Sequence, residues 1–346
     1  MAVLVDDVGS FPLPLRVGRK LFDEAYVRAR RAIGAGMGIA TDSFLQESFY
    51  SVVVESFRMK CAAGLDVVNY PQHYDMHRQL TDVITLAMEK GTYVVDEKDA
   101  IIPEVFVIGE EARRFYEEFG KKIRLRVCVV GPLELYLKLV GTVPYRDVLL
   151  MLAETAKRFA ENSILNSKYV KTEVVSLDEP SFGFLNVSAD KDVILDVLKK
   201  AFSFTGVTKQ IHLHSSLKAT DALDIDGLDV VSLEFGASPK NLDGLSKKTL
   251  DQVDKYVRVG VTRTDVDSIR AELYDMGIEK PAVDQLVEPE ETMRKRFNVA
   301  REKFGERLLF VGPDCGLGGW PSQEAAELLL KRTVDAVKKA QSALVI

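Results

Sequence analysis

Eight short runs of apolar and β-branched residues recur along the chain, and several are followed by a segment with helical spacing. The pattern predicts strands at residues 3–8, 65–70, 124–130, 172–177, 208–213, 228–234, 256–261 and 308–312. Helical patterns between them include Arg146 to Leu165, Asp190 to Phe202 and Gln323 to Lys339. Regular alternation of strands and helices indicates a parallel sheet. Eight such units in 346 residues favour the α/β fold of a closed (β/α)8 TIM barrel.

Two stretches depart from this simple repeat. The stretch between the first two strands is too long for one crossover, so we expect a helical insertion over 18–63 whose last helix runs from about Asp42 to Ala63. A β-hairpin insertion is expected near 92–107. Because the chain shows neither an internal repeat nor a low-complexity linker, we expect a single catalytic barrel domain over 1–346, without a duplicated N-terminal barrel.

The composition excludes several classes of function. The net charge is −6, and no basic stripe is present, which argues against a nucleic-acid partner. No window reaches the roughly 18 uninterrupted apolar residues that a membrane helix needs, and the first residues do not resemble a secretory signal. Three widely spaced cysteines, Cys61, Cys128 and Cys315, do not suggest a disulfide framework. We therefore expect a cytoplasmic protein with reduced thiols and no membrane partner.

Compact polar or sulfur-containing motifs follow five of the predicted strands, and the catalytic residues of a (β/α)8 barrel lie at these strand ends. The motifs are Gly9-Ser10-Phe11-Pro12, Asp178-Glu179-Pro180, His212-Leu213-His214-Ser215-Ser216, Glu234-Phe235-Gly236 and Gly312-Pro313-Asp314-Cys315-Gly316-Leu317. Some members could be structural. Asp178 and Glu179 could hold their loop through backbone amides, and Ser10 could cap the next helix.

The histidine pair indicates a metal site when it is combined with two other residues. His212 and His214 are two apart on a strand, so both side chains point to the same face. A lone His-x-His is more often structural, but Glu234 and Cys315 lie at neighbouring strand ends. Nitrogen, oxygen and sulfur donors together suit zinc better than magnesium or calcium. Cys61 and Cys128 lie within a helical and a strand pattern, where small buried hydrophobes are expected.

Together these motifs resemble the cobalamin-independent methionine synthase family, and above all the catalytic C-terminal barrel of its short archaeal and bacterial members. The matching segments extend over almost the whole chain and include Ser238-Pro239-Lys240-Asn241 after Glu234-Phe235. The resemblance implies a methyltransferase that transfers a methyl group to the zinc-activated thiol of homocysteine and so makes methionine. The methyl donor would be a methyl-folate (5-methyltetrahydrofolate) or a methyl-corrinoid protein.

The family binds zinc through a His-x-Cys pair after strand five, a glutamate after strand six and a cysteine after strand eight. Glu234 and Cys315 match the last two positions, but no cysteine lies near strand five of this chain. Either His212-Leu213-His214 or His214-Ser215-Ser216 can be aligned with the pair. We favour the first alignment, because imidazole is a good zinc ligand and a serine hydroxyl is a poor one.

The resemblance also assigns the substrate contacts. Asp178 would bind the amino group of homocysteine and act in catalysis, and Ser10 would hold its carboxylate. Two family residues are missing: an acid after strand two, unless Asp75 replaces it, and a histidine after strand seven. The candidate proton donors that could replace this histidine are His73, His77 and Asp265.

Three alternatives differ from this hypothesis. A methyltransferase of the same fold could serve another thiol and take its methyl group from a corrinoid protein. A non-catalytic accessory subunit could keep the barrel without the chemistry, and a partner subunit could then supply the missing parts. A relative of uroporphyrinogen decarboxylase is disfavoured by Asp178-Glu179-Pro180 and Pro313-Asp314-Cys315-Gly316-Leu317.

Overall fold

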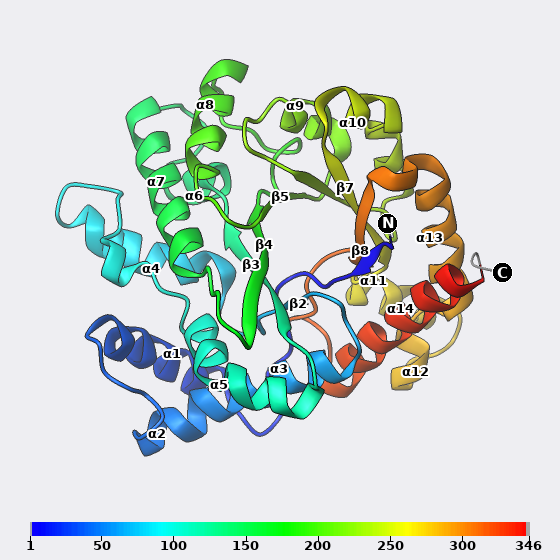
Figure 1. Cartoon of the computed structure of the whole chain (residues 1–346), viewed down its shortest axis with the longest axis horizontal. Coiled ribbons are helices and arrows are strands. Elements are labelled where there is room, and N and C mark those ends of the chain that lie inside the picture. The colour runs from blue at the N-terminus through cyan, green and yellow to red at the C-terminus, as the bar shows by residue number, and fades with distance from the viewer. Residues whose placement is uncertain (1, 344–346) are drawn as a thin grey trace.

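The eight predicted strands form one parallel sheet that curls into a barrel, with helices around its outside (Figure 1). The computed structural model describes residues 2–343. The sheet order is β1-β8-β7-β6-β5-β4-β3-β2, so the expected TIM-barrel fold is confirmed. The strands are β1 (Leu4–Val5), β2 (Val68–Asn69), β3 (Ile123–Val130), β4 (Val170–Asp178), β5 (Thr208–Leu213), β6 (Val230–Glu234), β7 (Tyr256–Thr262) and β8 (Leu308–Pro313).

Amphipathic helices cover the outer face of the sheet (Figure 1). In α7 (Arg146–Asn162), for example, Leu149, Leu152, Ala156 and Phe159 are buried at helical spacing. Five further helices are α4 (Met76–Met88), α6 (Pro132–Leu139), α8 (Lys191–Ala201), α9 (Ala219–Leu223) and α14 (Gln323–Ser342). The other helices after the insertion are α5 (Pro103–Phe119), α10 (Lys247–Val253), α11 (Val266–Asp275), α12 (Val283–Leu286) and α13 (Glu290–Phe304). Within residues 2–343, no helix has both the length and the apolar character that crossing a membrane requires.

The helical insertion after β1 is confirmed. It contains α1 (Arg19–Gly34), α2 (Ser43–Leu45), a π-helical turn (Gln46–Tyr50) and α3 (Ser51–Ala62). The Asp42 side chain accepts a hydrogen bond from the Leu45 amide at 3.0 Å, which explains why the helical segment begins there. The insertion has an apolar core of its own, built around aromatic residues such as Phe22 and Phe49.

The predicted β-hairpin near 92–107 is wrong. The structure has a 3-10 turn at Glu97–Asp99 and then α5, which begins at Pro103. Proline favours the first position of a helix, because its φ angle is already helical and that position needs no N–H donor. The apolar run that resembled a strand therefore supplies the buried face of a helix, with Val105, Ile108 and Ala112 turned inward.

Between the two shortest strands, β1 and β2, the barrel is closed by a backbone bridge that pairs Asp6 with Val67 and by side-chain contacts. The Asp66 carboxylate accepts a hydrogen bond from the Val5 amide at 2.8 Å, and the Asp7 carboxylate accepts one from the Asn69 amide at 2.8 Å. The buried Lys60 ammonium lies 2.7 Å from Asp7 and donates to the Gly9 carbonyl at 3.2 Å. The closure therefore depends on a buried ion pair as well as on backbone pairing.

Replacing Lys60 should test this dependence. We expect Lys60→Met to lower the free energy of unfolding by about 3–5 kcal/mol, because the substitution leaves the Asp7 carboxylate buried without its partner. The exposed Lys248 provides the control, and Lys248→Met should change the stability little. Urea unfolding followed by circular dichroism measures both variants, and equal midpoints would contradict this role for Lys60.

Candidate metal centre

The four predicted metal ligands lie together at the carboxyl end of the barrel. His212 is in β5, His214 follows that strand, Glu234 ends β6 and Cys315 follows β8. One ligand atom from each residue lies within 4.8 Å of the other three. The Nε2 atom of His214 is 3.5 Å from Cys315 Sγ and 3.4 Å from Glu234 Oε1. The barrel thus brings two nitrogen donors, one oxygen donor and one sulfur donor to one point.

His212 is buried in an orientation that suits a metal ligand. Its Nδ1 atom lies 3.1 Å from the Ser232 hydroxyl, which fixes the ring. Its Nε2 atom is buried and has no hydrogen-bond partner among the described residues. An unsatisfied buried polar atom costs about 1–3 kcal/mol, and coordination to a cation would remove that cost. A second hydrogen bond that orients the imidazole is typical of histidines that bind metals.

Burial moves all four groups toward their uncharged forms. It lowers the pKa values of His212 and His214. Burial, with the negative charges of Asp314 and Asp265, raises the pKa of Glu234 to about 8. Burial and the nearby Glu234 raise the pKa of Cys315 to about 12. A divalent cation would favour neutral imidazoles together with an ionised carboxylate and thiolate, and this donor set suits zinc.

Asp314 holds the segments that carry two of the candidate ligands next to each other, a role that was not expected from the sequence. Its carboxylate accepts hydrogen bonds from the amides of Phe235, Gly236 and Ala237 at 3.0, 2.8 and 2.7 Å. Glu234 immediately precedes these amides, and Cys315 immediately follows Asp314. A side chain at Gly260 would collide with the carboxylate, because a Cβ atom there would lie 2.2 Å from Asp314 Oδ1. The only sequence signal was the position of Asp314 next to the cysteine.

A small cavity of about 80 Å³ lies beside the cluster, and Ser10 and Asp178 line it together with three of the four candidate ligands, His212, His214 and Cys315. Asp178 is buried and accepts a hydrogen bond from the Ser176 hydroxyl at 2.8 Å. Burial raises its pKa to about 6, although two arginines oppose this shift. The Ser10 hydroxyl accepts a hydrogen bond from the Gly318 amide at 3.1 Å, so it contacts the loop after β8 and does not cap a helix.

Glu179 has the structural role that was left open for it. Its carboxylate accepts hydrogen bonds from the Leu133 and Glu134 amides at 2.9 and 2.7 Å, at the first turn of α6.

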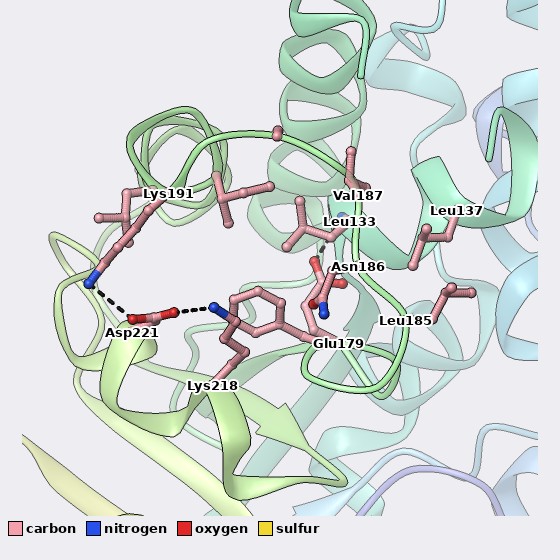
Figure 2. A pocket seen from close by; sticks show the side chains of 13 residues that line it. Leu133, Leu137, Glu179, Leu185, Asn186, Val187, Lys191, Lys218 and Asp221 are labelled. Carbon is pink, nitrogen blue, oxygen red and sulfur yellow. Dashed lines mark hydrogen bonds and ion pairs between the residues drawn. The ribbon is translucent and has the colours of Figure 1, made fainter. Parts of the chain in front are cut away.

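Glu179 also lines a second cavity, shown in Figure 2, whose wall is largely apolar. At one side of this cavity Asp221 bridges Lys191 and Lys218, with N–O distances of 3.0 and 2.7 Å (Figure 2).

The structure argues against two of the three candidate proton donors. Both ring nitrogens of His73 are engaged, one with the Phe11 carbonyl and one with the Ser56 hydroxyl, each at 2.9 Å, and burial lowers its pKa to about 3. Although burial opposes the shift, hydrogen bonds from Arg263 lower the pKa of Asp265.

His77 differs from these two residues because its side chain is 24% exposed, and its Nε2 atom lies 2.9 Å from Glu134 Oε1.

Asp75, which could have replaced the missing acid after strand two, caps α4 instead. Its carboxylate accepts a hydrogen bond from the Arg78 amide at 2.8 Å.

Comparison with known proteins supports the fold alone. No protein-family model matches the chain, and no curated protein matches it. The structure is similar to a B12-independent methionine synthase from Shewanella sp. W3-18-1 in complex with selenomethionine, with a TM-score of 0.58, 14% identity and coverage of 100% of this chain and 99% of that chain. It is also similar to a methyltransferase from Methanosarcina mazei, with a TM-score of 0.52, 14% identity and coverage of 97% and 94%. The chain therefore shares its barrel fold with these two proteins.

The hydrogen bond between Ser232 and His212 can be tested through metal affinity. If the cluster binds zinc, Ser232→Ala should weaken zinc binding about 10- to 100-fold, because the imidazole loses the group that orients it. Ser203 is exposed and bonds only to the carbonyl of Lys200, so Ser203→Ala is the control. Competition with a chromophoric chelator measures both affinities, and unchanged binding in Ser232→Ala would show that this contact is dispensable.

Proposed function

We propose that this protein is a zinc-dependent methyltransferase that converts homocysteine to methionine. The observation that carries the proposal is the cluster of His212, His214, Glu234 and Cys315 beside a cavity lined by Ser10 and Asp178. The same residues were selected from the sequence by a resemblance to methionine synthases. The shared fold with a methionine synthase and a methyltransferase agrees with the proposal but does not identify the substrate.

The proposed chemistry begins with the thiol. A free thiol has a pKa of about 8.5 and is mostly protonated at neutral pH, so it is a weak nucleophile. When bound by the four ligands, zinc supplies the positive charge that keeps a coordinating thiol ionised. The protein then has to hold the amino acid so that its sulfur faces the methyl group, which is a contribution from orientation.

Asp178 and Ser10 are the residues that would orient the amino acid. Asp178 is a buried carboxylate beside the metal ligands, and an ammonium group there would form a charge-assisted hydrogen bond with it. Ser10 lies against the glycine-rich loop after β8, where a side chain at Gly316 would come within 2.3 Å of the Ser10 hydroxyl. Ser10 lines the same small cavity as Asp178, and in the proposed complex it would hold the amino-acid carboxylate.

Metal content tests the ligand assignment. We expect about one zinc per chain in protein purified without chelator, and Cys315→Ala should remove most of it. Cys61 and Cys128 are buried and do not belong to the cluster, so alanine variants at these positions serve as controls and should keep the metal. Elemental analysis measures all three variants.

Two results would contradict the ligand assignment. Full zinc retention in Cys315→Ala would show that Cys315 is not a zinc ligand. Zinc loss in Ser216→Ala but not in His212→Ala would favour the alternative alignment, in which His214-Ser215-Ser216 matches the family's His-x-Cys pair. Absence of zinc from the unmodified protein would favour the accessory-subunit hypothesis.

Substrate binding tests the role of Asp178. We expect Asp178→Asn to weaken homocysteine binding about 10- to 100-fold, because a hydrogen bond to a charged group contributes about 1.5–3 kcal/mol. The matched control is 4-mercaptobutanoic acid, which has the thiol and the carboxylate but no amino group. Its affinity, measured by calorimetry, should be the same for both proteins. Equal weakening for the two ligands would show that Asp178 acts on the site as a whole and not on the ammonium group.

A further inference from the structure

Gln72 presents an unpartnered acceptor at the small cavity beside the candidate ligands. The residue is only 5% exposed, yet it lines both this cavity and a larger one of about 390 Å³. Its Oε1 atom accepts no hydrogen bond from the described residues. This oxygen lies against Gly9 in the wall of the small cavity, because a Cβ atom at Gly9 would be 3.0 Å from it. A ligand group that donates a hydrogen bond would therefore be stabilised here.

Two neighbouring side chains fix the orientation of the Gln72 amide. Its Nε2 atom donates to the Tyr70 hydroxyl at 3.1 Å and lies 3.4 Å from Gln79 Oε1. The Tyr70 hydroxyl is 2.9 Å from the Cys128 carbonyl and donates to it, because a carbonyl can only accept. The Tyr70 oxygen is then an acceptor, so the atom of Gln72 that faces it has to be the nitrogen. The amide oxygen is consequently the atom that remains for a ligand.

The other polar groups of the small cavity indicate which ligand group Oε1 receives. Asp178 is also an acceptor, and one of its oxygens already accepts from the Ser176 hydroxyl. An ammonium group has three N–H donors, so it is best satisfied by a second acceptor besides this carboxylate. A backbone bridge pairs Gln72 with Ser10, the residue proposed to hold the amino-acid carboxylate. One charged and one neutral acceptor thus line the cavity in which the amino acid would bind.

We propose that Gln72 is a specificity-determining residue that selects thiols with a free primary amine. Its Oε1 atom accepts a hydrogen bond from the substrate ammonium beside Asp178, and Tyr70 is the positioning residue that orients the amide. The inference rests on the proposed function and extends it to a substrate class. A thiol without the amine leaves the buried oxygen unpaired, and a site built around a hydrogen bond disfavours such an analogue.

Binding to the zinc-loaded full chain, measured by calorimetry, tests this selection. The two ligands are homocysteine and 4-mercaptobutanoic acid, which differ only in the amino group. We expect Gln72→Met to weaken homocysteine binding about 10-fold, because a hydrogen bond to a charged group is lost, and to leave the other affinity within about twofold. Tyr70→Phe should act in the same direction and less strongly. The exposed Gln252 provides the matched control, and Gln252→Met should change neither affinity.

A second substitution separates ligand binding from a purely structural role. Gln72→Glu keeps an oxygen acceptor on a side chain of the same length, so it should retain the preference for homocysteine over 4-mercaptobutanoic acid. Zinc content and circular dichroism should be the same for all variants. If Gln72→Met fails to fold, Tyr70→Phe provides the comparison, because it keeps the ring and removes only the hydroxyl that orients the amide.

The remaining outcomes distinguish this inference from the proposed function. Equal losses with both ligands, or no loss with either, would overturn the role of Gln72, and so would a Gln72→Glu variant without the preference. A selective loss in Asp178→Asn but not in Gln72→Met would overturn this inference and leave the proposed function intact. Unmodified zinc-loaded protein that binds neither ligand would contradict the proposed function itself.

Discussion

The Asp6 carboxylate joins two arginines inside the barrel, and this arrangement extends to His212 of the candidate metal site. Asp6 follows β1 and lies 2.6 Å from the Arg126 guanidinium of β3 and 2.8 Å from the Arg258 guanidinium of β7. Arg258 also donates to the Pro313 carbonyl in β8 at 2.8 Å and to the Ser232 hydroxyl in β6 at 3.4 Å. Ser232 in turn contacts His212 in β5. One buried network therefore links the segment after β1 with β3, β5, β6, β7 and β8, and it ends at a proposed metal ligand.

Burying such a charged network in the barrel interior has a high cost in free energy. Taking charges out of water carries a desolvation penalty that a buried ion pair repays only with close geometry and additional hydrogen bonds. Apolar residues of similar volume would often stabilise a barrel interior at least as well. What the charged network provides is a fixed orientation for His212, which lies beside the other three candidate ligands and whose Nε2 atom has no hydrogen-bond partner among the described residues. Asp314 orients two other candidate ligands, because its carboxylate holds the segment after Glu234 next to Cys315.

The sequence predicted those features that depend on local pattern. Runs of β-branched residues identified all eight strands, and the barrel then required that His212, Glu234 and Cys315 meet at one end. Local pattern failed where one apolar run fits two structures, as at Ile101–Ile108, where Pro103 starts a helix. It also failed to distinguish His73 from His77. The partners that separate them, Phe11, Ser56 and Glu134, are distant in the sequence and become neighbours only when the barrel has formed.

X-ray absorption at the zinc edge tests the central claim most directly, because it counts the ligands and identifies them by distance. The account predicts one zinc with a single sulfur ligand at about 2.3 Å and nitrogen or oxygen ligands at about 2.0–2.2 Å. Addition of homocysteine should bring a second sulfur to the metal at about the same distance. A spectrum with no sulfur ligand, or one that homocysteine leaves unchanged, would contradict the account of this site as a centre for thiol activation.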